Sequence, residues 1–220
     1  MGPIVLLVVV RILAGVSIAA VFWSRAMWSK QLFPFAIAVG SSAIVEFIAY
    51  VSMATHGSNI IVYNFFMPIE FMLLIWYAYL QVGGTTRKFL PVVILAYLFL
   101  WSIEMGSMAH PSSTMTTNAF ALGIIVLSPL YFFLLYKEAD RTEGSLLRSP
   151  HFWANFSIVL SFVTLGPAMG LLRYLVQEAS PLAVSITILF PLIAILRFAL
   201  SITSMWVYRK YHLSMIDARS

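Results

Sequence analysis

Four ionisable residues lie deep inside long apolar segments of this chain: Arg11, Glu46, Glu70 and Arg197. At the centre of a membrane each isolated charge costs about 2.5–3.5 kcal/mol on insertion scales, so the four together cost about 10–14 kcal/mol. Two positive and two negative charges sum to zero, and we therefore expect them to share one interior. The simplest arrangement pairs Glu70 with Arg11 or Arg197. Intramembrane charges usually mark a ligand or ion site, and the alternative is a neutral network that only fixes helix register.

The stretch Y-N-F-F-M-P-I-E-F, residues 63–71, adds a phenol and an amide next to Glu70. Tyr63, Met67, Glu70 and Tyr77 follow helical spacing, so Tyr63 and Glu70 should face the same way. Pro68 removes a backbone hydrogen bond and frees the carbonyl of the residue four positions earlier. These features predict a polar cleft that is open to the outside and ends at the midplane charges. The candidate residues of a ligand site or ion pathway are Arg11, Glu46, Tyr63, Asn64, Glu70 and Arg197.

Composition places these residues in a membrane protein. Hydrophobic residues make up 61% of the 220 residues and charged ones 10%, with a mean hydropathy of +0.94. A soluble domain is nearer half apolar and a quarter charged. We expect a single integral membrane domain over residues 1–220, with the lipid bilayer as its surroundings. There is no cysteine, which excludes a disulfide framework and a thiolate metal site. The net charge of +5 does not indicate nucleic-acid binding, because no basic run exceeds two residues.

Seven apolar segments are each close to the ~20 residues that cross a bilayer as a helix. The sequence therefore predicts an all-α transmembrane bundle of seven helices, which closes on itself and brings the seventh span beside the first. Prolines inside several spans predict kinks. The first segment lacks a basic n-region and is expected to be a retained span. The predicted spans are 3–23, 34–54, 60–82, 89–107, 118–136, 153–176 and 181–208.

Basic residues in the loops predict the orientation of this bundle. Loops after the first, third and fifth spans, with the C-terminal tail, contain ten Lys and Arg residues, whereas only Arg173 falls toward the other side. Because Lys and Arg collect in cytoplasmic loops, the N-terminus should lie outside and the C-terminus in the cytoplasm. We expect a multi-pass protein of the cell inner (plasma) membrane. The ten basic residues are Arg25, Lys30, Arg87, Lys88, Lys137, Arg141, Arg148, Arg209, Lys210 and Arg219.

Several cofactors and catalytic classes are not indicated. A retinal protein needs a lysine within its last span, and all four lysines lie at span ends or in loops. None of the four histidines lies in the middle of a span, which argues against haem. The motifs H-E-x-x-H, G-x-S-x-G and the P-loop are absent from the sequence. We expect neither a cofactor nor a metal.

Two stretches resemble an uncharacterised family of small seven-span bacterial membrane proteins. One is Y-N-F-F-M-P-I-E-F at residue 63, and the other is H-F-W-A-N-F-S-I-V-L at residue 151. The resemblance implies a bacterial inner membrane protein and brings no activity with it. The matching positions are Tyr63, Asn64, Ile69, Glu70, Phe71, Phe152, Trp153 and Asn155.

Three functions are compatible with these patterns. The first is a sensory or signalling accessory, in which an outward-facing polar pocket acts through a membrane partner protein. The second is a small-solute or ion transporter that uses the midplane charges. The third is an intramembrane enzyme in which Glu46 or Glu70 acts as acid or base with Tyr63 or His56 nearby; a further possibility is an assembly subunit of a larger complex.

Overall fold

The described part of the chain is helical and contains seven helices long and apolar enough to span a membrane. The computed structural model describes residues 3–108, 110, 114–142, 145–177 and 187–213. No strand occurs among these residues, so the predicted all-α fold with seven spans is confirmed. Short helical turns cover Ala26–Trp28, Leu146–Arg148 and Tyr208–Leu213. The seven helices are α1 (Pro3–Ser24), α2 (Phe33–His56), α3 (Ile60–Gln81), α4 (Gly84–Ser107), α5 (Thr117–Arg141), α6 (Pro150–Gln177) and α8 (Leu189–Val207).

Helix ends differ from the predicted spans where a helix continues beyond its apolar part. Helix α4 begins at Gly84 and not at residue 89, because its polar first turn is helical as well. Helix α5 continues past residue 136 to Arg141 for the same reason. Helix α6 begins at Pro150, since proline is well suited to the first helical position. The predicted start of the seventh span, residue 181, lies outside the described residues, and α8 begins at Leu189.

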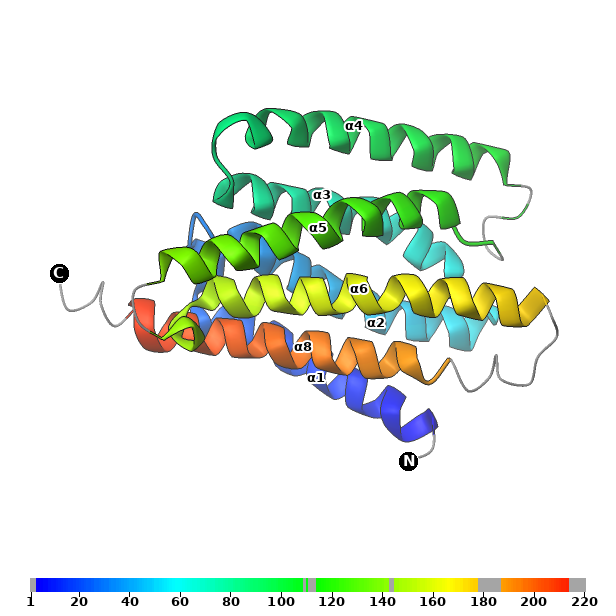
Figure 1. The fold of residues 1–220 in the computed structure, drawn as a ribbon. Coiled ribbons are helices and arrows are strands. Elements are labelled where there is room, and N and C mark those ends of the chain that lie inside the picture. The colour runs from blue at the N-terminus through cyan, green and yellow to red at the C-terminus, as the bar shows by residue number, and fades with distance from the viewer. Residues whose placement is uncertain (1–2, 109, 111–113, 143–144, 178–186, 214–220) are drawn as a thin grey trace.

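Six of the helices form a closed ring, and α4 lies outside it (Figure 1). Around the ring, α1 packs on α2, α2 on α3, α3 on α5, α5 on α6, α6 on α8, and α8 on α1. Helix α4 contacts α3 and α5 at the edge of the bundle. The seventh span therefore lies beside the first, as predicted. This ring gives the bundle an interior that α2, α3, α6 and α8 all reach.

One half of this interior is densely filled. Leu74, Tyr77 and Tyr131 are fully buried there, and the Tyr131 hydroxyl donates to the Leu74 carbonyl at 2.7 Å. A small polar residue joins α8 to α6, because the hydroxyl of the fully buried Ser204 donates to the Pro150 carbonyl at 2.8 Å. Small side chains let neighbouring helices approach closely in a membrane protein. We call the three fully buried residues Leu74, Tyr77 and Tyr131 the Tyr77 layer.

Cations and aromatic rings meet at one end of the bundle, which we call the basic end: residues 24–32, 82–88, 137–142, 145–150 and 208–213. The Arg87 guanidinium lies 4.1 Å from the centre of the Tyr79 ring. Arg209 lies over Trp23 at 4.2 Å and donates a hydrogen bond to the Trp23 carbonyl. Such pairs combine cation–π attraction with side chains that favour the membrane–water interface. The pairs are consistent with the orientation predicted from the loop charges, which stays a prediction.

Candidate functional site

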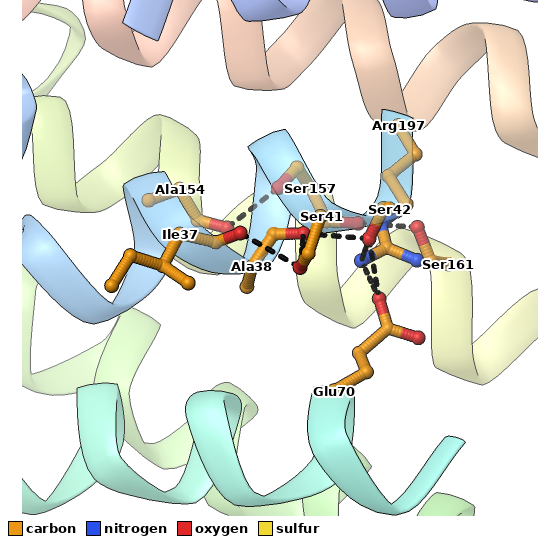
Figure 2. Close-up of polar contacts among 9 residues, drawn as sticks. All are labelled: Ile37, Ala38, Ser41, Ser42, Glu70, Ala154, Ser157, Ser161 and Arg197. Atoms are coloured by element: carbon orange, nitrogen blue, oxygen red, sulfur yellow. Dashed lines mark hydrogen bonds and ion pairs between the residues drawn. The ribbon is translucent and has the colours of Figure 1, made fainter. Parts of the chain in front are cut away.

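Glu70 and Arg197 form an ion pair in the middle of the bundle, between α3 and α8 (Figure 2). Their side chains are 13% and 17% exposed, respectively. Ser42 of α2 completes the group: its Oγ lies 3.0 Å from Glu70 Oε1 and accepts a hydrogen bond from Arg197 at 3.3 Å. Of the two arginines considered as partners of Glu70, the structure selects Arg197. Three helices are thus joined at one level by a carboxylate, a guanidinium and a hydroxyl.

Arg11 lies apart from this group. Its guanidinium stacks on the Tyr50 ring, 3.7 Å from the ring centre, between α1 and α2. The Tyr50 side chain is 50% exposed, so this pair lies on the outer surface of the ring of helices. For Arg11, this cation–π contact takes the place of an ion pair with a carboxylate. The structure therefore pairs Glu70 with Arg197, places Glu46 on the wall of the same cavity, and leaves Arg11 on the flank of α1.

A cavity of about 370 Å³ begins at the ion pair and extends toward the end of the bundle opposite the basic end. We call it the main cavity. Its volume is within the ~300–1,000 Å³ typical of small-molecule sites. The fully buried Tyr77 layer lies beyond its deep end, and none of the three residues of that layer lines the cavity. The lining residues are Ser42, Val45, Glu46, Asn59, Tyr63, Phe66, Met67, Glu70, Met115, Phe120, Phe162, Leu165, Met169, Phe190, Ile193, Ala194, Arg197 and Phe198.

Glu46 lines the wall of the main cavity without an ion-pair partner among the described residues. It lies one helical turn from Ser42 on α2, about 6 Å along the helix axis. Its carboxylate accepts a hydrogen bond from the Tyr63 hydroxyl at 3.4 Å, a long contact. Arg11 and Arg197 act on this carboxylate only at longer range than an ion pair. With Glu46 and Glu70 ionised against Arg197, the described lining residues carry one negative charge in excess.

Aromatic rings and thioethers form most of the remaining wall. Phenylalanine comes from four helices, for example Phe66 of α3, Phe162 of α6 and Phe198 of α8. Met67 and Met169 add flexible apolar side chains, which adapt to irregular ligand shapes. The faces of aromatic rings attract cations. The main cavity therefore offers an apolar, aromatic wall with one unpaired carboxylate.

Asn64 does not line the main cavity, although the sequence grouped it with the site residues. Its side chain is fully buried and holds the chain between α4 and α5. Asn64 Nδ2 donates to the Thr114 carbonyl at 2.8 Å, and the Thr116 backbone N–H donates to Asn64 Oδ1 at 3.0 Å. The Asn64 carbonyl, which Pro68 deprives of its helical partner, accepts a hydrogen bond from Trp101 Nε1 at 2.9 Å. Asn64 thus positions α4 and the start of α5 beside the site.

Ser42 and the phenylalanines are site residues that the sequence did not single out. Ser42 and Glu46 are four residues apart on α2, so they share a face, and that spacing was a usable signal. The phenylalanines had no such signal, because apolar residues face both the lipid and the interior in a membrane helix. Tyr77, which shares the helical spacing of Tyr63 and Glu70, lies two turns beyond Glu70 and belongs to the Tyr77 layer. Its hydroxyl meets His151 Nδ1 at 2.8 Å.

A smaller hollow of about 220 Å³ lies at the basic end, on the other side of the Tyr77 layer. We call it the basic-end recess. All but two of its lining residues carry polar side chains, so its character differs from that of the main cavity. The lining residues are Gln31, Leu80, Gln81, Leu134, Lys137, Glu138, Arg141 and His151.

The described residues contain no group of three or more His, Asp or Glu side chains that could hold a metal ion. Comparisons with known proteins give no relative for this chain. No protein-family model, no curated protein and no solved structure matches it. The resemblance noted from the two short stretches accordingly contributes no activity, and function has to be inferred from the main cavity itself.

Proposed function

We propose that this protein is a membrane receptor that binds a small organic cation with an apolar body in the main cavity and passes the signal to a membrane partner. The unpaired carboxylate of Glu46 carries the proposal. Leaving a charge unpaired in a low-dielectric interior is costly, and a bound ammonium group would offset that cost. The phenylalanine and methionine walls suit the apolar body of such a ligand and add cation–π attraction.

The Tyr77 layer favours a receptor over a pathway through the bundle. In this structure the main cavity ends at Glu70 and Arg197, and fully buried side chains fill the interior beyond them. The described connections at the basic end, 25–32, 82–83, 142 and 145–149, are short. A change in the bundle would therefore reach the cytoplasm through a partner that contacts the helices.

Ligand chemistry can be tested with three probes of similar shape and different charge. These are 2-phenylethylamine, 2-phenylethanol and 3-phenylpropionic acid, each titrated against the purified protein in nanodiscs while the melting temperature is followed. Ligands that bind only the folded state raise that temperature in a concentration-dependent way. We expect the amine to stabilise the protein most. If the acid or the alcohol stabilises it as well as the amine does, the proposed ligand class is wrong.

The role of Glu46 is tested with a matched pair of variants. Glu46→Gln should weaken amine binding by about tenfold or more, equivalent to about 1.4 kcal/mol. Glu104→Gln is the control, because Glu104 is a carboxylate outside the main cavity. It accepts hydrogen bonds from the backbone N–H groups of Asn118 and Ala119 at 3.0 and 2.9 Å. Equal amine affinity in the two variants would show that Glu46 does not take part in amine binding.

Transport of a solute is the second candidate, because the main cavity and the basic-end recess approach the Tyr77 layer from opposite ends. A transporter would open that layer alternately to each side. Proteoliposomes loaded with radiolabelled 2-phenylethylamine separate the two functions. Efflux faster than from protein-free liposomes, and lost in Glu46→Gln, would favour transport; amine binding without efflux supports the receptor.

A further inference from the structure

A second cluster of polar groups lies in the basic-end recess, where four elements of the fold converge. Gln31 comes from the turn before α2, Gln81 from the end of α3, Lys137 and Arg141 from the end of α5, and His151 from the first turn of α6. None of these residues lines the main cavity. The recess is therefore independent of the proposed receptor site.

Lys137 and Arg141 place two positive charges on the same wall of the recess. They are four residues apart on α5 and so face the same side of the helix. Like charges at this spacing destabilise a helix, and the two side chains repel each other here. Lys137 is half-buried, so bulk water screens its charge less than it would on an open surface. An anion bound between the two side chains would attract both cations and offset their mutual repulsion.

The hydrogen-bonding capacity of the recess is not used up by its internal contacts. Lys137 Nζ donates to the Gln81 carbonyl at 2.8 Å, which satisfies an end-of-helix acceptor. An ammonium group has three donors, so further N–H groups remain for a ligand. Gln81 is fixed by a double amide contact with Asn155, at 3.2 and 3.0 Å. The Gln81 carbonyl, which accepts the hydrogen bond from Lys137, therefore belongs to a residue that Asn155 holds in place. Lys137 is thus already positioned on the wall of the recess.

The single carboxylate of the recess has a hydrogen-bond partner of its own. Glu138 accepts a hydrogen bond from the Ser149 hydroxyl. On the facing wall, His151 Nε2 lies 3.2 Å from Gln31 Oε1 and Nδ1 meets the Tyr77 hydroxyl at 2.8 Å, which fixes the plane of the imidazole. With Lys137 and Arg141 against Glu138, the lining carries one positive charge in excess, counting the imidazole as neutral.

We infer that the basic-end recess binds a phosphate group, held by Lys137 and Arg141. Guanidinium and ammonium groups are the usual protein ligands of phosphate, the first through paired N–H donors and the second as a point charge. Basic pockets between transmembrane helices at the cytoplasmic side also bind phosphorylated lipid headgroups. The phosphate could come from a lipid headgroup or from a soluble phosphate, and the chemistry of recognition is the same for both.

The test uses the full-length, delipidated protein in a neutral detergent, with two probes titrated separately. One probe is inorganic phosphate, followed by the change in melting temperature. The other is short-chain phosphatidylglycerol, followed by native mass spectrometry with phosphatidylcholine of the same chain length as reference. We expect phosphate, phosphatidylglycerol or both to bind. Binding of only one identifies the source of the phosphate group; binding of neither overturns the inference.

Matched charge variants assign the binding to the recess. Lys137→Gln with Arg141→Gln should weaken binding of the effective probe by at least about tenfold. The control is Arg87→Gln with Lys88→Gln, which removes the same charge from the same end of the bundle outside the recess. Affinity should change less than about twofold in this control. An equal loss of probe affinity in both double variants would mean nonspecific surface attraction and would refute the assignment. If the Lys137→Gln and Arg141→Gln double variant fails to fold, the single variant Arg141→Gln, at an exposed position, is compared with Arg87→Gln in the same way.

Discussion

Replacing Glu70 with glutamine should destabilise the protein, and the structure indicates by how much. The substitution keeps the size of the side chain and removes its charge, so Arg197 loses its ion-pair partner. Breaking a buried pair from one side typically costs ~3–5 kcal/mol. Arg197 keeps a hydrogen bond to Ser42 and borders a cavity large enough for water, so the lower end of that range applies. We expect a loss of about 3 kcal/mol.

A loss of that size is measurable as a change in melting temperature. For a domain of 150–250 residues, each kcal/mol shifts the melting temperature by about 2–4 °C, so Glu70→Gln should lower it by about 6–12 °C. The assay is thermal unfolding of the purified protein in a mild detergent, followed by tryptophan fluorescence. Size-exclusion chromatography of each variant confirms that the starting material is folded.

A double-mutant cycle shows whether Arg197 is the partner. Glu70→Gln combined with Arg197→Gln should recover most of the loss, because no lone charge remains in the interior. Arg11→Gln is the matched control. Arg11 stacks on Tyr50 and does not contact Glu70, so its removal should recover nothing in the Glu70→Gln background. Recovery by Arg11→Gln, or an unchanged melting temperature in Glu70→Gln alone, would refute the pairing.

Three further predictions follow from other parts of the bundle. A topology reporter fused at Pro111 should report the outside and one at the C-terminus the cytoplasm; a cytoplasmic signal at Pro111 would contradict the seven-span orientation. Trp101→Phe should cost ~1 kcal/mol in thermal unfolding, because it removes the donor to the Asn64 carbonyl that Pro68 leaves without a helical partner. A methyl group added at Gly166 would come within 3.1 Å of an α5 isoleucine, whereas one added at Gly40 meets open space. Gly166→Ala should therefore have a lower melting temperature than Gly40→Ala, and equal melting temperatures would contradict the close packing.

The seven spans and the pairing of Glu70 with an arginine could be predicted from sequence because both follow from the cost of placing polar groups in lipid. Span number depends only on the length of apolar segments, and a charge deep in a span is costly unless another group offsets it. The choice between Arg11 and Arg197 depends on how each helix is rotated about its axis. Apolar residues cover both faces of α1, so no stripe in the sequence fixes that rotation. The cation–π contact with Tyr50 is an option that charge counting does not include.

Asn64 shows a limit of sequence-based prediction. Adjacent residues in a helix point about 100° apart, but this does not exclude a shared cavity, since Phe66 and Met67 both line the main cavity. Tyr63 lines the main cavity, whereas Asn64 points toward the chain between α4 and α5. Its amide was as polar as the others in sequence, yet its partners are backbone groups near residue 115. Contacts of that kind, between a side chain and a distant backbone, leave no pattern in a single sequence.

The structural network and the proposed ligand site, our two explanations of the midplane charges, concern different residues. A network that fixes helix register explains Glu70, Arg197 and Ser42, since each satisfies another and the three join α2, α3 and α8. It does not explain Glu46, which is held only by a long contact with Tyr63 and would be cheaper as an apolar residue. The double variant Glu70→Gln with Arg197→Gln should therefore fold and still distinguish an amine from a neutral alcohol, whereas Glu46→Gln should fold and lose that distinction. If the double variant no longer distinguishes an amine from an alcohol and Glu46→Gln still does, the ion pair is the ligand site and the role of Glu46 is structural.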